Sequence, residues 1–196
     1  MDIQLYAAKL ERPLTDEETE TFLRIMPPER RERLLRVPKE ELRHEPLCAY
    51  AILYMVMRTV YGWKKLPPMR YNKYGKPEFE GYPDVQFNIS HTHRAVLVGV
   101  HNEPIGVDIE KIRPVSERTM ERIAGTTSRK EFFESWVRRE SRSKWNGAGL
   151  GSIRENENPA MLGERIVPVD TFPDYVACVC THSSARLAPV RTFTID

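Results

Sequence analysis

The sequence predicts an α+β fold, because helical and strand patterns occur together in both halves of its 196 residues. Residues 47–57 are almost entirely apolar, and Gly62 follows them closely, which is typical of a buried core helix. Residues 85–111 instead contain short apolar runs separated by turn residues, which is typical of strands. The chain is long enough to bury a substantial core, as one large domain or two small ones.

The first third of the chain is predicted to hold one strand and three helices. Residues 1–10 form the strand. Thr15 and Glu18 give the capping-box pattern of a helix that ends at the Pro-Pro pair 27–28. A second helix begins in "ERRERLLRV", and the apolar helix at 47–57 follows it.

The middle of the chain is predicted to be richer in strands. "FNIS" and "AVLVGV" are strands, and "IGVDIE" is expected to return beside "AVLVGV" in a hairpin whose turn is 101–104. Ser128 and Glu131 form a second capping box, which opens a helix that stops before Gly147. Residues 151–165 are expected to form a loop, and "RIVPVDTF" and "YVACVCTH" are the last predicted strands.

Composition narrows the cellular setting and the function classes. Cys178 and Cys180 alternate in a strand, and we expect buried thiols, without a disulfide framework, in a reducing compartment. The N-terminus lacks the pattern of a signal peptide, and residues 47–57 are too short to cross a bilayer. A net charge of +2 gives no argument for nucleic acid. A cytoplasmic protein that binds neither membrane nor nucleic acid is therefore expected.

Two carboxylates one residue apart are the first candidates for chemistry. In "GVDIE", strand alternation places Val107 and Ile109 on one face and Asp108 and Glu110 on the other. Adjacent carboxylates repel each other unless a cation or water separates them. Carboxylate oxygens with room for water and phosphate suit Mg²⁺. The alternative is an exposed strand face that carries two solvated acids.

The helix that follows offers a third carboxylate. Trp136, Glu140 and Lys144 fall at four-residue steps on one face, which begins with aromatic residues and ends with charged ones. Such a face is expected to pack at one end and to open into a cleft at the other. The alternative is a surface Glu-Lys pair, which contributes only about 0.3–0.5 kcal/mol.

Basic and polar residues elsewhere could bind phosphate. Arg30 and Arg33 lie in "PERRERLLR", and Lys76 lies in the turn "YGKPEF". Ser90 and His91 end a strand, where a hydroxyl and an imidazole can contact phosphate oxygens. The alternatives are a solvated helix face balanced by neighbouring glutamates and a structural histidine.

Taken in order, these residues resemble the 4′-phosphopantetheinyl transferases of the surfactin-synthetase-activating type. The similarity rests on the blocks "YGKPEF", "FNISHT", "IGVDIEKIRP" and "WVRRESRSK", the last matching the pattern Trp-x-x-Lys-Glu-Ser/Ala-x-x-Lys. "ERPLTDEETETFLRIMPPERRERL" resembles the N-terminal region of the family, and "YVACVC" fits a late strand. Each block alone is weak, but their shared order is specific.

The resemblance implies a fold and an activity. The fold would be a pseudo-dimer of two similar α+β halves with the active site in the cleft between them. Residues 1–104 would form the coenzyme A-binding half, and residues 105–196 the half with the magnesium site and catalytic helix. The protein, expected to be a monomer, would transfer 4′-phosphopantetheine from coenzyme A to a serine of an apo-acyl or peptidyl carrier protein, with Mg²⁺, releasing 3′,5′-ADP.

The resemblance also assigns roles to residues. The family's magnesium ligands match Asp108, Glu110 and Glu140. Glu140 would act as the base, directly or through a metal-bound water, and Lys144 would stabilise the departing 3′,5′-ADP. The expected catalytic set is therefore Asp108, Glu140 and Lys144. The expected coenzyme A contacts are Arg30, Arg33, His44, Lys76, Ser90, His91 and Lys144.

Some positions depart from the family pattern. His44 stands where the family usually has Arg, and Arg139 stands where it usually has Lys. The segment 111–132, expected to help meet the carrier, is short. Two other classes stay open: a non-catalytic protein that binds coenzyme A or a carrier, and a basic nucleic-acid-binding module using "ERRERLLR", which lacks a recognised motif.

Overall fold

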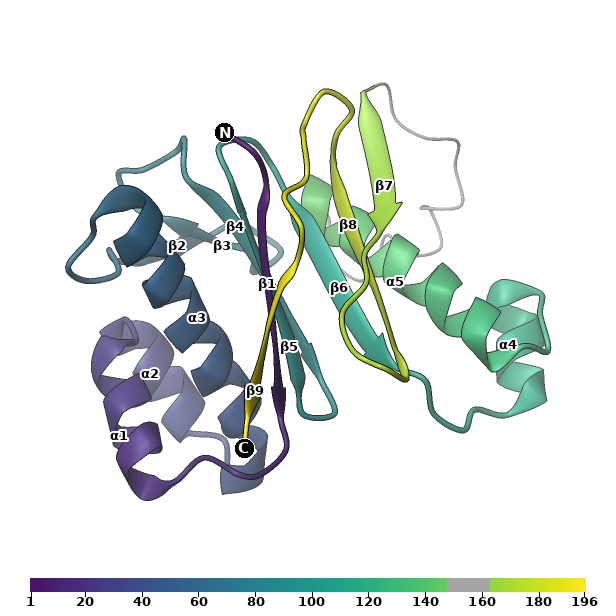
Figure 1. Cartoon of the computed structure of the whole chain (residues 1–196), viewed down its shortest axis with the longest axis horizontal. Coiled ribbons are helices and arrows are strands. Elements are labelled where there is room, and N and C mark those ends of the chain that lie inside the picture. Colours follow the sequence, from purple (N-terminus) through teal and green to yellow (C-terminus); the bar gives the residue numbers. More distant parts are fainter. Residues whose placement is uncertain (148–162) are drawn as a thin grey trace.

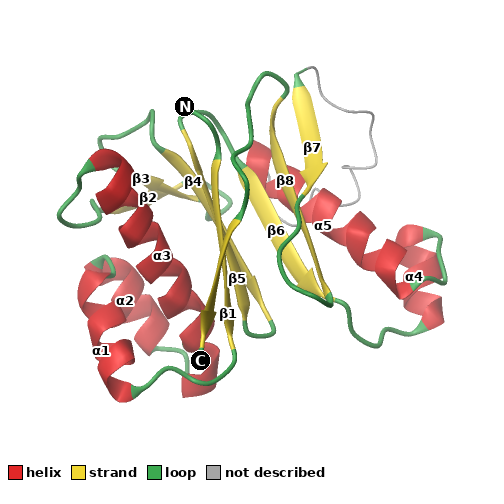
Figure 2. Ribbon diagram, viewed as in Figure 1, coloured by secondary structure: helices red, strands yellow, loops and turns green. Residues whose placement is uncertain are grey.

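Two β-sheets face each other between two layers of helices in the computed structural model, which describes residues 1–147 and 163–196 (Figure 1). The described residues confirm the predicted α+β class (Figure 2). In chain order the elements are β1 (Gln4–Leu10), α1 (Asp16–Ile25), α2 (Pro28–Leu35), α3 (His44–Tyr61), β2 (Met69–Tyr71), β3 (Pro77–Phe79), β4 (Gln86–Thr92), β5 (Ala95–His101), β6 (Gly106–Lys111), α4 (Glu117–Ala124), α5 (Arg129–Asn146), β7 (Glu164–Pro168), β8 (Tyr175–His182) and β9 (Arg191–Ile195).

The first sheet has the strand order β4-β5-β1-β9. Strand β1 runs antiparallel to β5 and parallel to β9. Alternation along β1 directs Tyr6 and Ala8 into a core shared with α3, and Leu5 and Ala7 into a core shared with the second sheet. Both faces of this sheet are therefore covered.

The second sheet has the antiparallel order β6-β8-β7, and α5 packs against β6 and β8. Val107, Ile109 and Val179 point toward the first sheet and join its core. The opposite face of β6 points toward α5, and this face carries Asp108. The alternation predicted for "GVDIE" is thus confirmed.

Two glycines allow the layers to approach closely. A Cβ at Gly106 on β6 would lie 2.0 Å from the Ser141 carbonyl oxygen and 2.4 Å from the Trp145 backbone nitrogen, both on α5. A Cβ at Gly99 on β5 would lie 2.7 Å from Cγ1 of Val107. Any side chain at either position would push β6 away from its neighbour.

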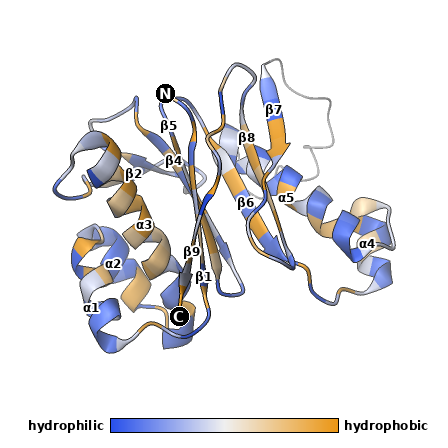
Figure 3. Cartoon of the chain, viewed as in Figure 1, coloured by the Kyte–Doolittle hydropathy of each residue, from blue (hydrophilic) through white to orange (hydrophobic). Residues whose placement is uncertain are grey.

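The capping signals in the sequence mark the ends of three helices correctly. Thr15 and Glu18 form a complete capping box at α1. Helix α3 is the apolar core helix, hydrophobic along its middle turns in Figure 3, and its C-cap is Gly62 with φ of 68°. Helix α5 begins after Ser128 and ends at Gly147.

Several local predictions need correction. Strand β6 does not return beside β5, because both edges of β5 are occupied by β4 and β1; β6 pairs with β8 instead. Ser128 caps α5, but the Glu131 carboxylate accepts from the Thr126 hydroxyl, so the second capping box is only half formed. The sequence reading missed α4 and β9. Of the loop predicted at 151–165, residues 151–162 lie outside the described residues, and its last two residues already belong to β7. The strand predicted over "RIVPVDTF" ends at Pro168.

Cys178 and Cys180 are buried thiols, as predicted, and Cys48 is also free and buried. Burial raises the pKa of the Cys178 thiol to about 11, which makes it a poor nucleophile. Among the residues described, no helix has both the length and the apolar character needed to cross a membrane.

Candidate functional site

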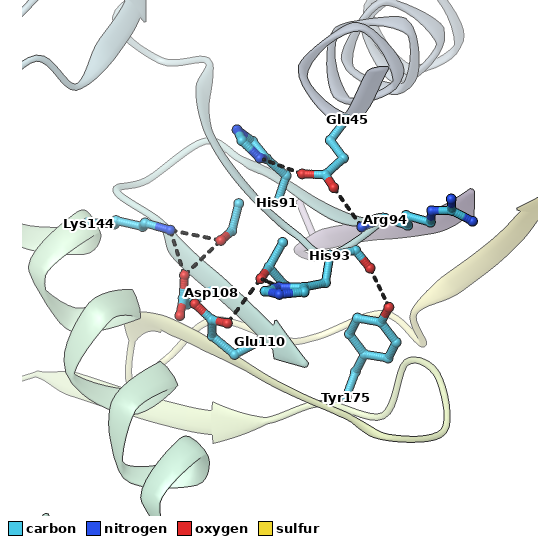
Figure 4. A network of polar contacts seen from close by, with 10 residues as sticks. Glu45, His91, His93, Arg94, Asp108, Glu110, Lys144 and Tyr175 are labelled. Atoms are coloured by element: carbon cyan, nitrogen blue, oxygen red, sulfur yellow. Dashed lines mark hydrogen bonds and ion pairs between the residues drawn. The ribbon is translucent and has the colours of Figure 1, made fainter. Parts of the chain in front are cut away.

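Strands β4 and β6 lie beside each other where the two sheets meet, and helix α5 covers the junction. The Asn88 side chain accepts a hydrogen bond from the Val107 backbone N–H at 2.9 Å, which joins the strands although they belong to different sheets. Polar contacts continue along the same pair of strands, from Ser90 to Asp108 and from Thr92 to Glu110. Figure 4 shows the labelled part of this network.

Asp108 is the most buried acid at the junction, with 4% of its surface exposed. Its Oδ1 accepts from the Lys144 ammonium and from the Ser90 hydroxyl, each at 2.7 Å. Its Oδ2 is buried and has no hydrogen-bond partner in the described structure. Burial raises the pKa of Asp108, although Lys144 and Ser90 oppose that effect.

Glu110 lies two residues further along β6 and is more exposed. Its Oε2 accepts from Arg113 at 2.7 Å and from the Thr92 hydroxyl at 3.0 Å. Asp108 and Glu110 are thus each held by a hydroxyl from β4 and by a cationic side chain. They are not two solvated acids on an open strand face.

Glu140 enters the junction from α5 and is buried, with 6% of its surface exposed. It makes no hydrogen bond or ion pair with another described residue. Burial, with the nearby charges of Asp108 and Glu110, raises the pKa of Glu140 to about 7, against the influence of Lys144. The three predicted acids therefore lie close enough to affect one another.

Lys144 pairs with Asp108 at 2.7 Å and also donates to the Ser90 hydroxyl at 2.9 Å. Within the described residues it forms no ion pair with Glu140. Trp136, one turn before Glu140, packs against an apolar cluster that includes Phe132. The surface-pair alternative for this helix face is therefore wrong.

The predicted basic contacts are spread over the first half. The Arg30 guanidinium lies over the rings of Tyr50 and Tyr71, and its Nε is buried with no partner among described residues. Arg33 is exposed on α2. His44 begins α3, and its Nδ1 is likewise buried without a described partner. None of the three contacts the acids.

Lys76 bridges the two halves. Its ammonium donates to the Ile105 carbonyl at 3.1 Å and to the Trp145 carbonyl at 3.3 Å. Burial lowers the pKa of Lys76 to about 8. The Trp145 carbonyl that it contacts belongs to the residue that follows Lys144 on α5.

His91 is half exposed and meets an acid that sequence reasoning did not select. Its Nδ1 lies 3.1 Å from Oε2 of Glu45. Burial raises the pKa of Glu45, but the bonds from His91 and from the Arg94 backbone outweigh it, and the net pKa lies below its ordinary value. Glu45 therefore stays ionised beside His91.

Thr92 could have been found from the sequence. It lies two residues after Ser90, so both side chains share a face of β4, and they contact acids that are also two residues apart. Glu45 and Tyr175 carry no such signal, because they reach the site from α3 and β8.

The acids suit Mg²⁺ in chemistry without forming a ready-made cage. No three Asp, Glu, His or Cys side chains in the described ranges are gathered closely enough to hold a metal ion as they stand. Mg²⁺ retains several waters and needs only one or two protein carboxylates with phosphate oxygens. The unpartnered Oδ2 of Asp108 and the unbonded carboxylate of Glu140 fit that requirement.

A separate cavity of about 780 Å³ lies between the first half of α5 and residues 168–178. None of the predicted site residues lines it. We therefore place the candidate site at the junction of β4, β6 and α5 rather than in this cavity.

The fold and the site define an α+β protein with clustered acids and a lysine at the junction of two sheets, an arrangement suited to acting on phosphate groups. The comparisons name the family. The chain is 32% identical to 4′-phosphopantetheinyl transferase Sfp of Bacillus subtilis (strain 168), over 99% of this chain and 88% of that one. It therefore belongs to the Sfp-type 4′-phosphopantetheinyl transferases, a family of enzymes.

Two further relatives from Bacillus subtilis carry the same family name. The chain is 30% identical to 4′-phosphopantetheinyl transferase ffp, over 91% of this chain and 92% of that one. It is 29% identical to another 4′-phosphopantetheinyl transferase, over 76% and 72% of the two chains. No protein-family model matches the chain.

Proposed function

We propose that the protein transfers 4′-phosphopantetheine from coenzyme A to a serine of an apo-carrier protein and releases 3′,5′-ADP, with Mg²⁺ as cofactor. The observation that carries this proposal is the contact of Lys144 with Asp108 and Ser90 beside Glu140. It brings together the Lys144 ammonium, the Ser90 hydroxyl and two acids, and these four side chains come from β4, β6 and α5. Family membership supplies the reaction class.

We assign Glu140 and Lys144 different roles in the transfer. A serine hydroxyl is a poor nucleophile, and a base with a pKa near neutral removes its proton best. Glu140, whose carboxylate has no hydrogen-bond partner among the described residues and lies near Asp108, would take that role, directly or through a metal-bound water. Lys144, whose ammonium is partly exposed, would turn from Asp108 to the phosphate oxygens and stabilise the departing 3′,5′-ADP.

Asp108, Glu110 and Glu140 would hold Mg²⁺. The ion, when bound, would neutralise the phosphate charge that develops during transfer. Ser90 and His91 would contact the diphosphate and 3′-phosphate, and Arg30, Arg33, His44 and Lys76 would supply positive charge on the coenzyme A side. The arrangement of a helix on a sheet in each half supports a pseudo-dimer with the substrate cleft between the halves.

The test uses apo-carrier proteins of the peptidyl, polyketide and fatty-acid types, which would also distinguish secondary-metabolite from lipid pathways. Each is incubated with the protein, coenzyme A and Mg²⁺, and mass spectrometry follows the carrier. We expect at least one carrier to gain phosphopantetheine, only with the metal. Coenzyme A binding by calorimetry without modification of any carrier would instead favour the non-catalytic binding protein.

A further inference from the structure

The turn between β4 and β5 has a backbone that its residues do not favour. Thr92 pairs with Ala95, so His93 and Arg94 form the whole turn. Both have positive φ, 40° and 67°. Two-residue turns with positive φ at both positions favour Asn and Gly, because larger side chains clash with the backbone there. This turn therefore depends on contacts from outside it.

Glu45 holds the turn from the side of α3. Its Oε1 accepts from the Arg94 backbone N–H at 2.6 Å, and its Oε2 lies 3.1 Å from Nδ1 of His91 (Figure 4). The ionised carboxylate of Glu45 thus contacts both the turn, at Arg94, and the end of β4, at His91. An N–H bonded to a charged acceptor is held more firmly than one bonded to a neutral group.

Tyr175 holds the turn from the side of the second sheet. Its hydroxyl donates to the His93 carbonyl oxygen at 2.6 Å (Figure 4). Tyr175 begins β8, which pairs with β6 through Lys111 and Glu110. The turn is therefore tied to the strand next to the one that carries the acids.

The residue before the turn contacts the site. The Thr92 hydroxyl donates to Oε2 of Glu110 at 3.0 Å and lies 3.0 Å from Nδ1 of His93. A change in the turn would therefore move Thr92 relative to Glu110, and His91 with it. Displacements of about 1 Å remote from the reacting atoms can slow a reaction by about 10²-fold.

We propose that Glu45 and Tyr175 are positioning residues of the transferase site, which act by holding the His93–Arg94 turn so that Thr92 keeps its place beside Glu110 and His91 its place at the end of β4. This proposal rests on the proposed function. Neither side chain needs to touch a substrate. The backbone conformation of the turn is what they control.

The first test compares two tyrosines that each donate to a carbonyl. Tyr175→Phe removes the bond to His93, and the control Tyr54→Phe removes a bond to the Lys64 carbonyl at 3.2 Å. We expect Tyr175→Phe to lower kcat for carrier modification about fivefold, the population change that one ordinary hydrogen bond produces. The KM for coenzyme A and the thermal midpoint should change as little as in the control. Equal kcat values for the two variants would overturn the proposal.

The second test asks whether turn residues that favour positive φ can compensate for the loss of Glu45. Glu45→Ala should lower kcat by about 10- to 100-fold, whereas Glu45→Gln, which still accepts from Arg94, should lose much less. Adding His93→Asn and Arg94→Gly to Glu45→Ala should restore most of the rate, because Asn-Gly adopts positive φ without help. Failure of this rescue would show that Glu45 acts otherwise and would overturn the proposal.

A third measurement does not depend on the reaction. Amide hydrogen exchange at Arg94, followed by nuclear magnetic resonance, should speed up in Tyr175→Phe and in Glu45→Ala but not in Tyr54→Phe. Unchanged exchange in the first two variants would overturn the positioning role. A wild-type protein that modifies no carrier yet shows these exchange differences would overturn the proposed function alone.

Discussion

Asp108 shows how the site handles a charge that would otherwise be costly to bury. One carboxylate oxygen is shared by an ammonium and a hydroxyl, while the other is buried and unbonded. A buried acceptor without a partner costs about 1–3 kcal/mol. The unbonded oxygen therefore lowers stability, and it is free to bind the Mg²⁺ ion that we propose.

Asp108→Ala should therefore abolish transfer and leave the fold intact. The buried face of β6 is untouched, and Lys144, which is partly exposed, can reach water when its partner is lost. The transfer rate with Mg²⁺ tests the loss of activity, and the thermal midpoint tests whether the fold stays intact. The exposed Asp84→Ala is the control and should keep full activity. A folded Asp108→Ala protein with wild-type rates would rule out the assignment.

Glu140→Gln and Lys144→Ala should fail in different ways. Glu140→Gln loses the base and should slow single-turnover transfer by about 10²–10⁴-fold, while coenzyme A affinity by calorimetry stays close to wild type. Lys144→Ala removes a phosphate partner, so both affinity and rate should fall.

The matched control for this pair is on the same helix. Lys130 and Glu134 form an exposed i,i+4 pair at 3.8 Å, and Lys130→Ala and Glu134→Gln should leave affinity and rate unchanged. If the Glu140 and Lys144 variants behaved like these controls, neither residue would belong to the active site.

At the scale of elements, strand β6 depends on close contact with α5. Gly106 lies where no Cβ fits between the two, and this contact brings Asp108 on β6 within reach of Lys144 on α5. The geometry of the acids is thus fixed by a residue that has no functional group.

Gly106→Ala should destabilise the protein by about 2–4 kcal/mol and slow transfer even where the variant stays folded, because β6 must move away from α5. Gly81→Ala is the control: its φ of 81° makes alanine strained, but nothing lies within 4 Å of the added Cβ. We expect a loss of only about 1–2 kcal/mol there. Urea unfolding measures both, and equal losses would contradict the steric explanation.

The sequence predicted the helices and strands more accurately than it predicted which strands pair with each other. Helix caps and strand alternation depend only on residues close together in the sequence. The start of α1, the start of α5 and the side of β6 on which Asp108 lies were therefore predictable. The pairing of β6 with β8 was not, because it depends on which strand edges the rest of the fold leaves open. Strand β9 was missed because it is short and mostly exposed, so its alternation of Phe193 and Ile195 with threonines gives only a weak signal. Glu45 and Tyr175 act through the turn backbone, for which the sequence gives no pattern.

At the scale of the whole molecule, Lys76 joins the N-terminal and C-terminal halves of the chain, because its ammonium donates to the Ile105 carbonyl just before β6 and to the Trp145 carbonyl in the last turn of α5. Its ammonium is largely withdrawn from water without a carboxylate partner in the described structure. Burial disfavours the charged form of Lys76, so the contact that this side chain makes between the halves is weakened while its ammonium is protonated.

Stability should consequently rise with pH between about 8 and 10.5. The pKa of Lys76 is about 8 in the folded protein and 10.5 ordinarily, so in this interval the folded state binds fewer protons than the unfolded one. The free energy of unfolding then increases by at most about 1.4 kcal/mol per pH unit. Lys76→Met cannot titrate, so its urea stability should fall behind wild type as the pH rises. A difference independent of pH would contradict the prediction.

Strand β9 lies parallel to β1 in the first sheet, although some 180 residues separate them along the chain. During synthesis on a ribosome, β1 emerges early, but the position beside it stays empty until residues 191–195 have also emerged. The stacked rings of Tyr6 and Phe193 cannot meet before then. Contacts between such distant segments close slowly. Assembly of the first sheet is therefore expected to wait until residues 191–195 have been synthesised, long after β1 and β5 have paired.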